Sequence, residues 1–360
     1  MPRDVFVPGR VCLLGEHTDW AGRLANARSP GRCLVVGTHE GLRATCDYAD
    51  DDDAYAFTMS SIDSSGATSS FTCDLRDRER LSEVARAGGF WSYVCGTVLE
   101  VLDAYEGAGC DFRRGVVVSN YATTLPTKKG LSSSAAACVL IARCFNVLYS
   151  LGMTTTDEMA LAFRGEAMRT PSACGAMDQA CAFGGGRTVL LTFDKEGSMD
   201  VREVECKGDI CILVGDLGRG KDTVTILASL QSAFKAGHEG ALEAFGPKNE
   251  ALMKRALDAI STGDARALGL VYTDAQRVFD AVGQELCPSE LSAPALHAVL
   301  EDATCRALSF GGKGVGSQGD GCVQFVCKSL TAADALEEYL KSTYPSMGTF
   351  LRVSLGGAPK

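Results

Sequence analysis

The chain has 360 residues, 46% of them hydrophobic and 22% charged, which is a globular balance in a length that favours two domains over one core. Its formal net charge of -10 argues against a nucleic-acid-binding surface, although a nucleotide needs only a local positive site. The 16 cysteines form no CxxC pair, and no apolar run approaches the ~20 residues that span a bilayer. We therefore expect reduced thiols, a cytoplasmic location and no membrane partner.

The first quarter of the chain predicts strands around a polar cluster. Glu16, His17 and Asp19 lie within eight residues bounded by Gly15 and Gly22. Such a density of donors and acceptors suits a polyhydroxylated ligand and is costly to bury otherwise, with a solvated turn as the alternative. Strands are predicted over residues 5–14, 33–38, 42–48, 55–61 and 68–75.

A loop of small residues follows a predicted helix over 90–102 and a predicted strand over 115–121. The loop contains Gly130 and three serines, Ser132 to Ser134, and it leads into a helix that continues to residue 151. A helix start exposes unpaired N–H groups and the positive end of a dipole, so it suits a phosphate. A serine N-cap on a buried helix is the alternative.

Asp178 is the one acid in the segment 174–179, which is otherwise small, amide or apolar. Such a carboxylate is either desolvated for chemistry or hydrogen-bonded as a helix cap, and the cap is the simpler explanation from sequence alone. A glycine-rich loop is predicted over 307–321. The remaining predicted elements are helices over 156–168, 289–302 and 331–343, several helices within 223–282, and strands over 187–194, 210–214, 322–327 and 349–355.

Four of these segments together resemble the GHMP kinases, the superfamily of galactokinase, homoserine kinase, mevalonate kinase and phosphomevalonate kinase. They are residues 8–22, 125–137, 174–179 and 311–321. The resemblance is closest to the galactokinase branch of sugar 1-kinases, and it covers nearly the whole chain in the family's order. The chain departs from the family pattern at Lys128, where glycine is usual, and in Gly314 to Gly321, which is longer and carries an acid.

The resemblance implies a two-domain α+β GHMP kinase fold with the active site between the domains. The N-terminal domain, residues 1–200, would be ribosomal-protein-S5-domain-2-like and bind ATP and sugar, and residues 201–360 would form a ferredoxin-like α/β C-terminal domain. The implied activity is ATP-dependent phosphorylation of a monosaccharide at the anomeric hydroxyl. Its cofactors would be ATP and Mg²⁺, and its partners would be a small-molecule sugar and ATP, without nucleic acid or membrane.

The resemblance also implies roles for individual residues. Asp178 would be the base, with Arg10 beside it, and Ser134 and Glu166 would hold the metal, Ser133 being the alternative to Ser134. The substrate-binding residues would be Glu16, His17, Asp19, Gly22, Cys174 and Gly175. The nucleotide-binding residues would be Trp91, Lys129, Gly130, Leu131, Ser132, Ser133, Ser134 and Ala135. From its helical spacing alone, Trp91 is expected to pack inward.

The sequence supports four alternative functions to different degrees. Arg23, Arg28 and Arg32 motivate a kinase for a uronic acid, and the superfamily also includes kinases for a mevalonate-like acid. A sensor that binds ATP and sugar without turnover is disfavoured, because Asp178 and the serines are present. A dinucleotide-binding oxidoreductase fits poorly, since the glycine-rich segment comes late and lacks an early strand–loop–helix context.

Overall fold

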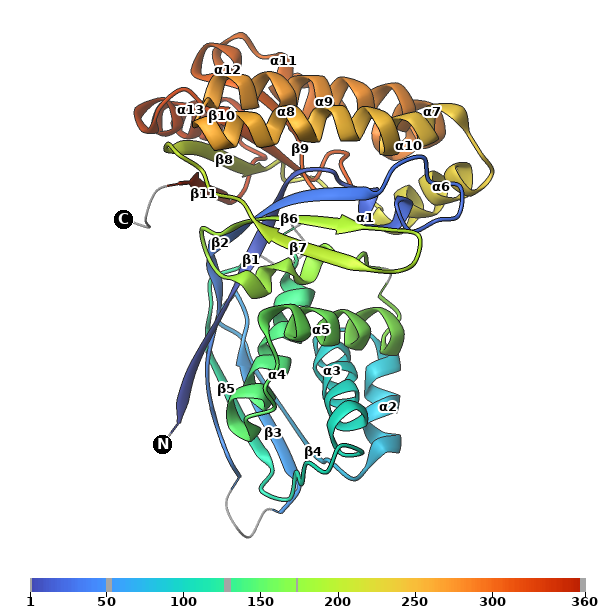
Figure 1. Cartoon of the computed structure of the whole chain (residues 1–360). Coiled ribbons are helices and arrows are strands. Elements are labelled where there is room, and N and C mark those ends of the chain that lie inside the picture. Colours follow the sequence, from blue (N-terminus) through green and yellow to red (C-terminus); the bar gives the residue numbers. More distant parts are fainter. Residues whose placement is uncertain (1, 50–53, 126–130, 173, 357–360) are drawn as a thin grey trace. The chain divides into compact units, whose positions relative to one another are not determined.

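The computed structural model describes residues 2–49, 54–125, 131–172 and 174–356. The chain forms two compact units, each built from two stretches of sequence (Figure 1). Unit 1 comprises Met1–Arg10 and Gly37–Gly185, and unit 2 comprises Val11–Val36 and Gly186–Lys360. These boundaries differ from one division after residue 200. The division into domains 1–200 and 201–360 stays a prediction that limited proteolysis can test.

Unit 1 is a sheet with helices on one face (Figure 1). The strand order is β4–β3–β5–β2, in which β3 and β5 are parallel and the other neighbours antiparallel. Its strands are β4 (Thr68–Asp74), β3 (Ala56–Ile62), β5 (Val116–Thr123) and the end of β2 (Gly31–Asp47), which pairs with β1 (Arg3–Leu14). Its helices are α2 (Arg78–Ala87), α3 (Phe90–Tyr105), α4 (Ser133–Tyr149), α5 (Thr155–Arg169) and the 3₁₀ helix η2 (Asp178–Phe183).

Small and apolar residues place α4 in the interior of unit 1. Ala135 to Ile141 are all buried, and Phe145 stacks on Phe57 of β3 at a centroid distance of 6.3 Å. The next helix, α5, begins with a capping box in which Thr154 and Asp157 satisfy each other's backbone N–H groups. The cap is therefore Thr154, and the helix begins at Thr155, one residue before the predicted range 156–168.

Unit 2 contains an antiparallel sheet in the order β11–β8–β10–β9. The start of β2 and the strands β6 and β7 form a second set of antiparallel pairs. Its strands are β6 (Thr188–Phe193), β7 (Met199–Glu203), β8 (Ile210–Asp216), β9 (Ser309–Gly314), β10 (Cys322–Cys327) and β11 (Phe350–Leu355). Its helices are α1 (Thr18–Ala21), α6 (Thr223–Lys235), α7 (Glu239–Glu243), η3 (Ala244–Lys248), α8 (Asn249–Thr262), α9 (Ala265–Leu286), α10 (Pro288–Leu291), α11 (Pro294–Glu301), α12 (Ala303–Leu308) and α13 (Leu330–Thr343).

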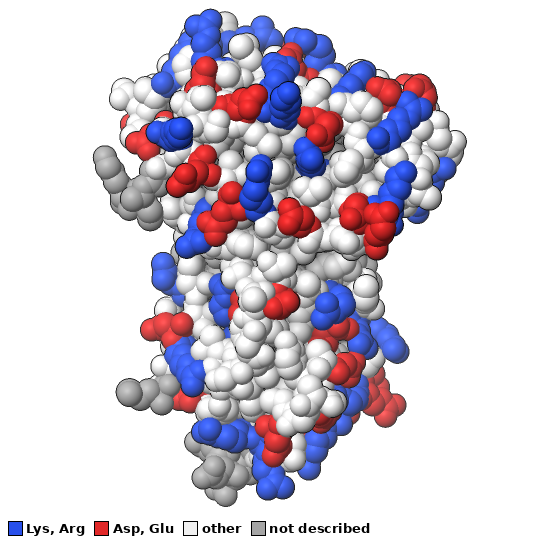
Figure 2. All heavy atoms as spheres, viewed as in Figure 1, with Lys and Arg blue, Asp and Glu red and all other residues white. Residues whose placement is uncertain are grey.

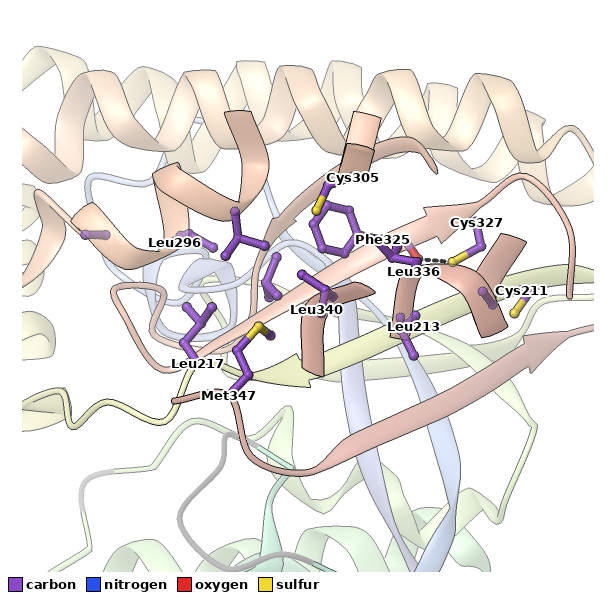
Figure 3. Close-up of a cluster of buried hydrophobic side chains, with 14 residues drawn as sticks. Cys211, Leu213, Leu217, Leu296, Cys305, Phe325, Cys327, Leu336, Leu340 and Met347 are labelled. Carbon is purple, nitrogen blue, oxygen red and sulfur yellow. Dashed lines mark hydrogen bonds between the residues drawn. The ribbon is translucent and has the colours of Figure 1, made fainter. Parts of the chain in front are cut away.

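A buried apolar cluster joins this sheet to the helices that cover it (Figure 3). Leu213 and Phe325 come from strands β8 and β10, and Leu296, Leu336 and Leu340 come from helices α11 and α13. Residues that alternate along a strand point to one face, so each strand contributes several side chains to the same core. The cluster holds strands β8 and β10 in place next to the candidate site segments of unit 2 that are described below.

Four predicted elements differ from the structure. The strands expected over 33–38 and 42–48 are one continuous strand, β2, and the helix expected over 289–302 is interrupted at Ala293, which has a φ of 43°. The first half of the expected glycine-rich loop is strand β9. Its glycines allow close packing, because a Cβ on Gly311 would lie 2.0 Å from the carbonyl oxygen of Gly269 in α9.

The cysteines and surface charges agree with the composition. All 16 cysteines are free thiols, 13 of them buried. On the face drawn in Figure 2, lysines and arginines are interspersed with acidic side chains on both units. Over the described part of the chain, every helix is too short or too polar to traverse a bilayer.

Candidate functional site

Asp178 forms an ion pair with Arg10 in unit 1. The guanidinium nitrogen Nη2 of Arg10 donates to Oδ1 of Asp178, and the Arg10 side chain is 4% exposed while that of Asp178 is 23% exposed. The expectation that Asp178 caps a helix is wrong, because the N-cap of η2 is Met177. A buried guanidinium that donates to a partly exposed carboxylate holds that carboxylate in a fixed orientation.

Arg10 also holds the loop of serines in place through its backbone. The backbone N–H of Arg10 donates to the carbonyl oxygen of Leu131 over 3.2 Å. A Cβ on Gly9 would lie 2.9 Å from that oxygen, so glycine permits the approach. The predicted nucleotide residues Lys129 and Gly130, and the departure at Lys128, lie outside the described residues.

The three serines occupy the start of α4, where backbone N–H groups are unpaired. Ser132 takes a left-handed conformation with a φ of 60°, and its buried Oγ has no hydrogen-bond partner among the described residues. Ser133 and Ser134 are the first residues of the 17-residue helix. The serine N-cap alternative holds for position only, since Ser132 is the N-cap residue of α4 but makes no capping hydrogen bond through its side chain.

Glu166 is a fully buried carboxylate close to this helix start. It accepts hydrogen bonds from Nε2 of Gln179 at 2.8 Å and from Oγ of Ser172 at 3.2 Å. Burial and the negative charge of Asp178 raise the pKa of Glu166 to about 7, against the opposing effect of hydrogen bonds that include one from Ser134. Ionised Glu166 would therefore be stabilised by a cation at this position.

The arrangement fits the expected magnesium ion. Mg²⁺ prefers hard oxygen ligands and keeps several waters, and Ser134 and Glu166 offer two such oxygens. The part of the chain that the structure describes contains no group of three or more His, Cys, Asp or Glu side chains that could hold a metal by itself. A metal bound here would therefore complete its shell with phosphate oxygens and water.

Two further predicted residues of unit 1 have clear surroundings. Trp91 is half-buried and stacks on Phe71, also half-buried, at a centroid distance of 5.7 Å, so the expected inward packing holds only in part, and its contact with a nucleotide stays a prediction. Cys174 is half-buried, with its Sγ 3.8 Å from Nε2 of Gln179, and burial raises the pKa of its thiol. For Gly175 and Ala135, the predicted ligand contacts also stay predictions.

The residues of unit 2 that were predicted to bind the substrate include two buried acids. Glu16 is 8% exposed, and its Oε1 accepts a hydrogen bond from the ammonium group of Lys313, which is 1% exposed. Asp19 is buried, and its Oδ1 accepts from the backbone N–H of Trp20 at 3.0 Å. The alternative of a solvated turn is therefore wrong for this segment. Its binding of a ligand stays a prediction.

His17 is a neutral ring in an aromatic environment. It stacks on Phe279 at a centroid distance of 5.5 Å and lies 5.7 Å from Phe245. Burial, together with the positive charges of Lys221 and Lys313, lowers the pKa of His17 to about 3. Its buried Nε2 has no hydrogen-bond partner among the described residues. The Nε2 atom of the neutral imidazole is therefore available to form one hydrogen bond with a hydroxyl group of a ligand.

Gly22 allows two segments of backbone to pack closely. A Cβ at this position would lie 2.0 Å from the backbone nitrogen of Gly31, so the end of α1 contacts the start of β2 directly. Glycine is required for that approach. Its role in substrate binding stays a prediction.

A pocket in unit 2 is lined by several of these residues. Its polar lining includes Glu16, Lys313 and Gln318, and its apolar lining includes Phe245 and Phe279. The mixture of a charged pair, an amide and aromatic faces suits a small polar molecule with hydroxyl groups. Lys313 was not predicted from sequence, although a lone lysine inside a glycine-rich strand was a signal that could have found it.

The arginines that motivated a uronic-acid substrate have acidic partners within unit 2. Arg28 donates to Glu239 and Glu243 at 2.6 and 2.7 Å, and Arg32 donates to Glu250 at 2.6 Å. The guanidinium of Arg23 lies 5.0 Å from the centre of the Phe193 ring. Paired in this way, Arg28 and Arg32 give no support to a carboxylate-binding site.

Asp320, the acid within the glycine-rich segment 311–321, has a structural partner. Oδ1 of Asp320 accepts from the backbone N–H of Leu296 at 2.9 Å, in the first turn of α11. The N-cap residue of that helix, Ala293, has no side-chain oxygen, so Asp320 replaces the missing cap from a distant part of the sequence. Lys221 holds the same segment by donating to the carbonyl oxygens of Val315 and Gln318.

Comparison with known proteins gives the relatives of the chain. Residues 92–186 match the family model described as the GHMP kinases N terminal domain. The galactokinase of Haemophilus influenzae is 27% identical over 292 residues, which cover 77% of this chain and 67% of that protein. The mevalonate kinase of Aeropyrum pernix is 24% identical and covers 93% of this chain and 92% of that protein.

Solved structures extend the similarity to the whole chain. Lactococcus lactis galactokinase complexed with galactose superposes with a TM-score of 0.69 at 17% identity, covering 99% of this chain and 94% of that one. Methanococcus jannaschii mevalonate kinase superposes with a TM-score of 0.70 at 15% identity, covering 98% of both chains. The expected resemblance and fold class are thus confirmed: the chain contains the N-terminal domain of the GHMP kinases and adopts the GHMP kinase fold, with galactokinases among its relatives.

Proposed function

We propose that this GHMP kinase homologue transfers the γ-phosphoryl group of ATP to a hydroxyl group of a monosaccharide, with the anomeric hydroxyl as the acceptor. The ion pair of Asp178 with buried Arg10, close to buried Glu166, is the observation that carries the proposal. It unites a candidate base, a cation that can share phosphoryl charge, and a candidate metal ligand. The similarity to galactokinases supports a sugar as the acceptor.

In this mechanism the residues of unit 1 bind the donor. The unpaired N–H groups at the start of α4 would accept the phosphates of ATP, and Ser134 and Glu166 would hold Mg²⁺. When bound, Mg²⁺ supplies positive charge that neutralises the phosphate oxygens. Glu166 would lose its proton on binding the metal, since its pKa of about 7 reflects burial beside Asp178 without that charge.

Asp178 would act on the acceptor. Its carboxylate takes the proton of the attacking hydroxyl as the new oxygen–phosphorus bond forms and the bond to the β-phosphate oxygen breaks, which leaves ADP. Arg10 orients Asp178 through their ion pair and would share the negative charge of the phosphoryl group. Glu16, His17 and Asp19 would bind the other hydroxyl groups of the sugar.

A mevalonate-like acid is the second candidate, because the mevalonate kinase of Aeropyrum pernix is similar over 92% of its own length. The experiment is therefore a panel of aldoses, uronic acids and mevalonate in an assay of ADP release coupled to NADH oxidation. We expect turnover of an aldose that falls by about 10²- to 10⁴-fold in Asp178→Asn. Turnover of mevalonate without any aldose would overturn the choice of a sugar. The cytoplasmic location stays a prediction.

A further inference from the structure

Lys313 is an unusual residue for the place it occupies. Its side chain is 2% exposed, although lysine is rarely buried without a charged partner, and it lies on β9 among glycines. The ammonium group has three protons to donate. It donates to Oε1 of Glu16 and, at 3.0 Å, to the carbonyl oxygen of Gly314, and it lies 5.6 Å from the centre of the Tyr272 ring.

Two of the three protons of Lys313 are donated to described acceptors of unit 2, the Glu16 carboxylate and the carbonyl oxygen of Gly314. The ion pair with Glu16 balances the charge of the ammonium group, and the Tyr272 ring lies nearby. Glu16 is the charged partner among these contacts, so Lys313 is placed to hold Glu16 in position.

Glu16 and Lys313 both line the pocket, so their pairing sets its charge. An uncharged acceptor can donate a hydroxyl proton to the Glu16 carboxylate, which is fixed by Lys313. An acceptor with a carboxylate would meet the negative charge of Glu16 while the positive charge next to it is already paired. Like charges in a water-poor pocket are strongly unfavourable, so the pair favours an uncharged acceptor.

We propose that Lys313 is a positioning and specificity-determining residue: it fixes Glu16 as a hydroxyl acceptor and, through that pairing, makes the pocket select uncharged sugars against sugar acids. The inference rests on the proposed sugar kinase function. It assigns the selectivity between sugars and sugar acids to Lys313, in the glycine-rich segment 311–321, rather than to Arg23, Arg28 or Arg32.

Two pairs of probes test the proposal: galactose with galacturonic acid, and glucose with glucuronic acid. Within each pair the ring stereochemistry is the same and a carboxylate replaces the terminal hydroxymethyl group. The measurement is kcat/KM for each probe, together with the KM for ATP, in the wild type, Glu16→Gln, Lys313→Met and the double variant Glu16→Gln/Lys313→Met. The wild type should prefer the uncharged member of the pair that it phosphorylates.

Glu16→Gln leaves the buried ammonium group without its counter-charge, and an acidic acceptor can restore it. The preference for the uncharged sugar should therefore fall by at least about ten-fold, which corresponds to roughly 1.4 kcal/mol. The double variant removes both charges and so avoids an unpaired buried ion. Its preference should return towards that of the wild type, and the KM for ATP should stay within about two-fold in every variant, since the donor site is built from other residues.

Lys313→Met separates a charge effect from a folding defect. It leaves the Glu16 carboxylate buried without its cation and without the contact that holds it, so the KM for the uncharged sugar should rise while the KM for ATP stays unchanged. The double variant, which removes both charges, should lose less of its affinity for that sugar. A structural role alone would lower activity towards all substrates equally and leave the ratios unchanged.

The outcomes separate this inference from the function on which it rests. A preference that stays within about two-fold of the wild type in Glu16→Gln, or a wild type that prefers the acid, overturns the role of Lys313 while the kinase function stands. A wild type that phosphorylates no sugar in the panel overturns the proposed function and this inference with it.

Discussion

Glu166 and Asp178 are neighbouring carboxylates whose surroundings differ. Asp178 has the guanidinium group of Arg10 beside it, whereas Glu166 is fully buried and hydrogen-bonded to an amide and a hydroxyl. Burial and Asp178 raise the pKa of Glu166 from 4.5 to about 7. Without a metal ion, Glu166 would therefore be partly protonated at neutral pH, and each proton released at this site is linked to cation binding.

This difference predicts a pH dependence of stability in the absence of Mg²⁺. Because the folded state binds the Glu166 proton more tightly than the unfolded state, the contribution of Glu166 to stability is largest below pH 4.5. It is lost as the pH rises from 4.5 to about 7. The total loss is about 3 kcal/mol, from a shift of roughly 2.5 pKa units at 1.36 kcal/mol each. Urea unfolding in EDTA should therefore show a steeper decline for the wild type than for Glu166→Gln. Parallel profiles of the two proteins would refute the assignment.

A second prediction at this scale concerns Asp19. Removing the Asp19 carboxylate would leave a hydroxyl group of the bound sugar without its hydrogen-bond acceptor. The loss costs about 1–3 kcal/mol of binding free energy, or roughly ten- to a hundred-fold in affinity. Asp19→Ala should therefore raise the KM for the sugar by about that factor and change the KM for ATP little. It should also narrow the difference between epimeric sugars. An unchanged epimer ratio in a stably folded variant would assign Asp19 to the turn that it forms with Trp20.

At the scale of elements, the start of α4 carries the proposed donor site. Ser134 is hydrogen-bonded to Glu166, whereas Ser133 has no such link to that carboxylate among the described contacts. Ser134→Ala should therefore weaken Mg·ATP binding and lower kcat by about ten-fold or more, with Ser133→Ala as the matched control. Calorimetric titration with Mg·ATP measures the first effect. A loss confined to sugar affinity would mean that the segment has another role.

The link from Asp320 to α11 predicts an effect on stability alone. Asp320→Ala removes the acceptor for the Leu296 N–H, and loss of such a cap costs about 1 kcal/mol. The midpoint of urea unfolding should fall accordingly, while the KM for ATP stays unchanged. An increase in the KM for ATP with unaltered stability would place Asp320 at the donor instead.

Elements and motifs differ in how far the sequence reveals them. Alternating and helical patterns predicted most strands and helices of both units, because burial imposes those periods. The patterns failed where long-range contacts decide the conformation. In β9, Gly311 and Gly312 suggested a loop, but they form a strand because helix α9 packs directly on its backbone.

The candidate site shows the same limit at the scale of the whole molecule. Glu16 and Asp178 stand out chemically among their neighbours in the sequence, whereas Arg10 and Glu166 were predicted only through the resemblance to a kinase family. Lys313 stands out among glycines, but its pairing with Glu16 could not be predicted from sequence, because the two residues are 297 positions apart and meet only in the folded chain. For the same reason the sequence could not show that Arg28 and Arg32 are occupied by acidic partners.

The central claim is that the folded chain transfers phosphate from ATP to a sugar hydroxyl with Asp178 as the base. The measurement that tests it most directly is ³¹P NMR of ATP, Mg²⁺ and the preferred aldose incubated with the wild type or with Asp178→Asn. The account predicts a sugar 1-phosphate and an equal amount of ADP for the wild type, with a rate lower by about 10²- to 10⁴-fold for the variant, which still binds ATP. ATP consumed without a sugar phosphate, or full turnover by a folded Asp178→Asn protein, would contradict it.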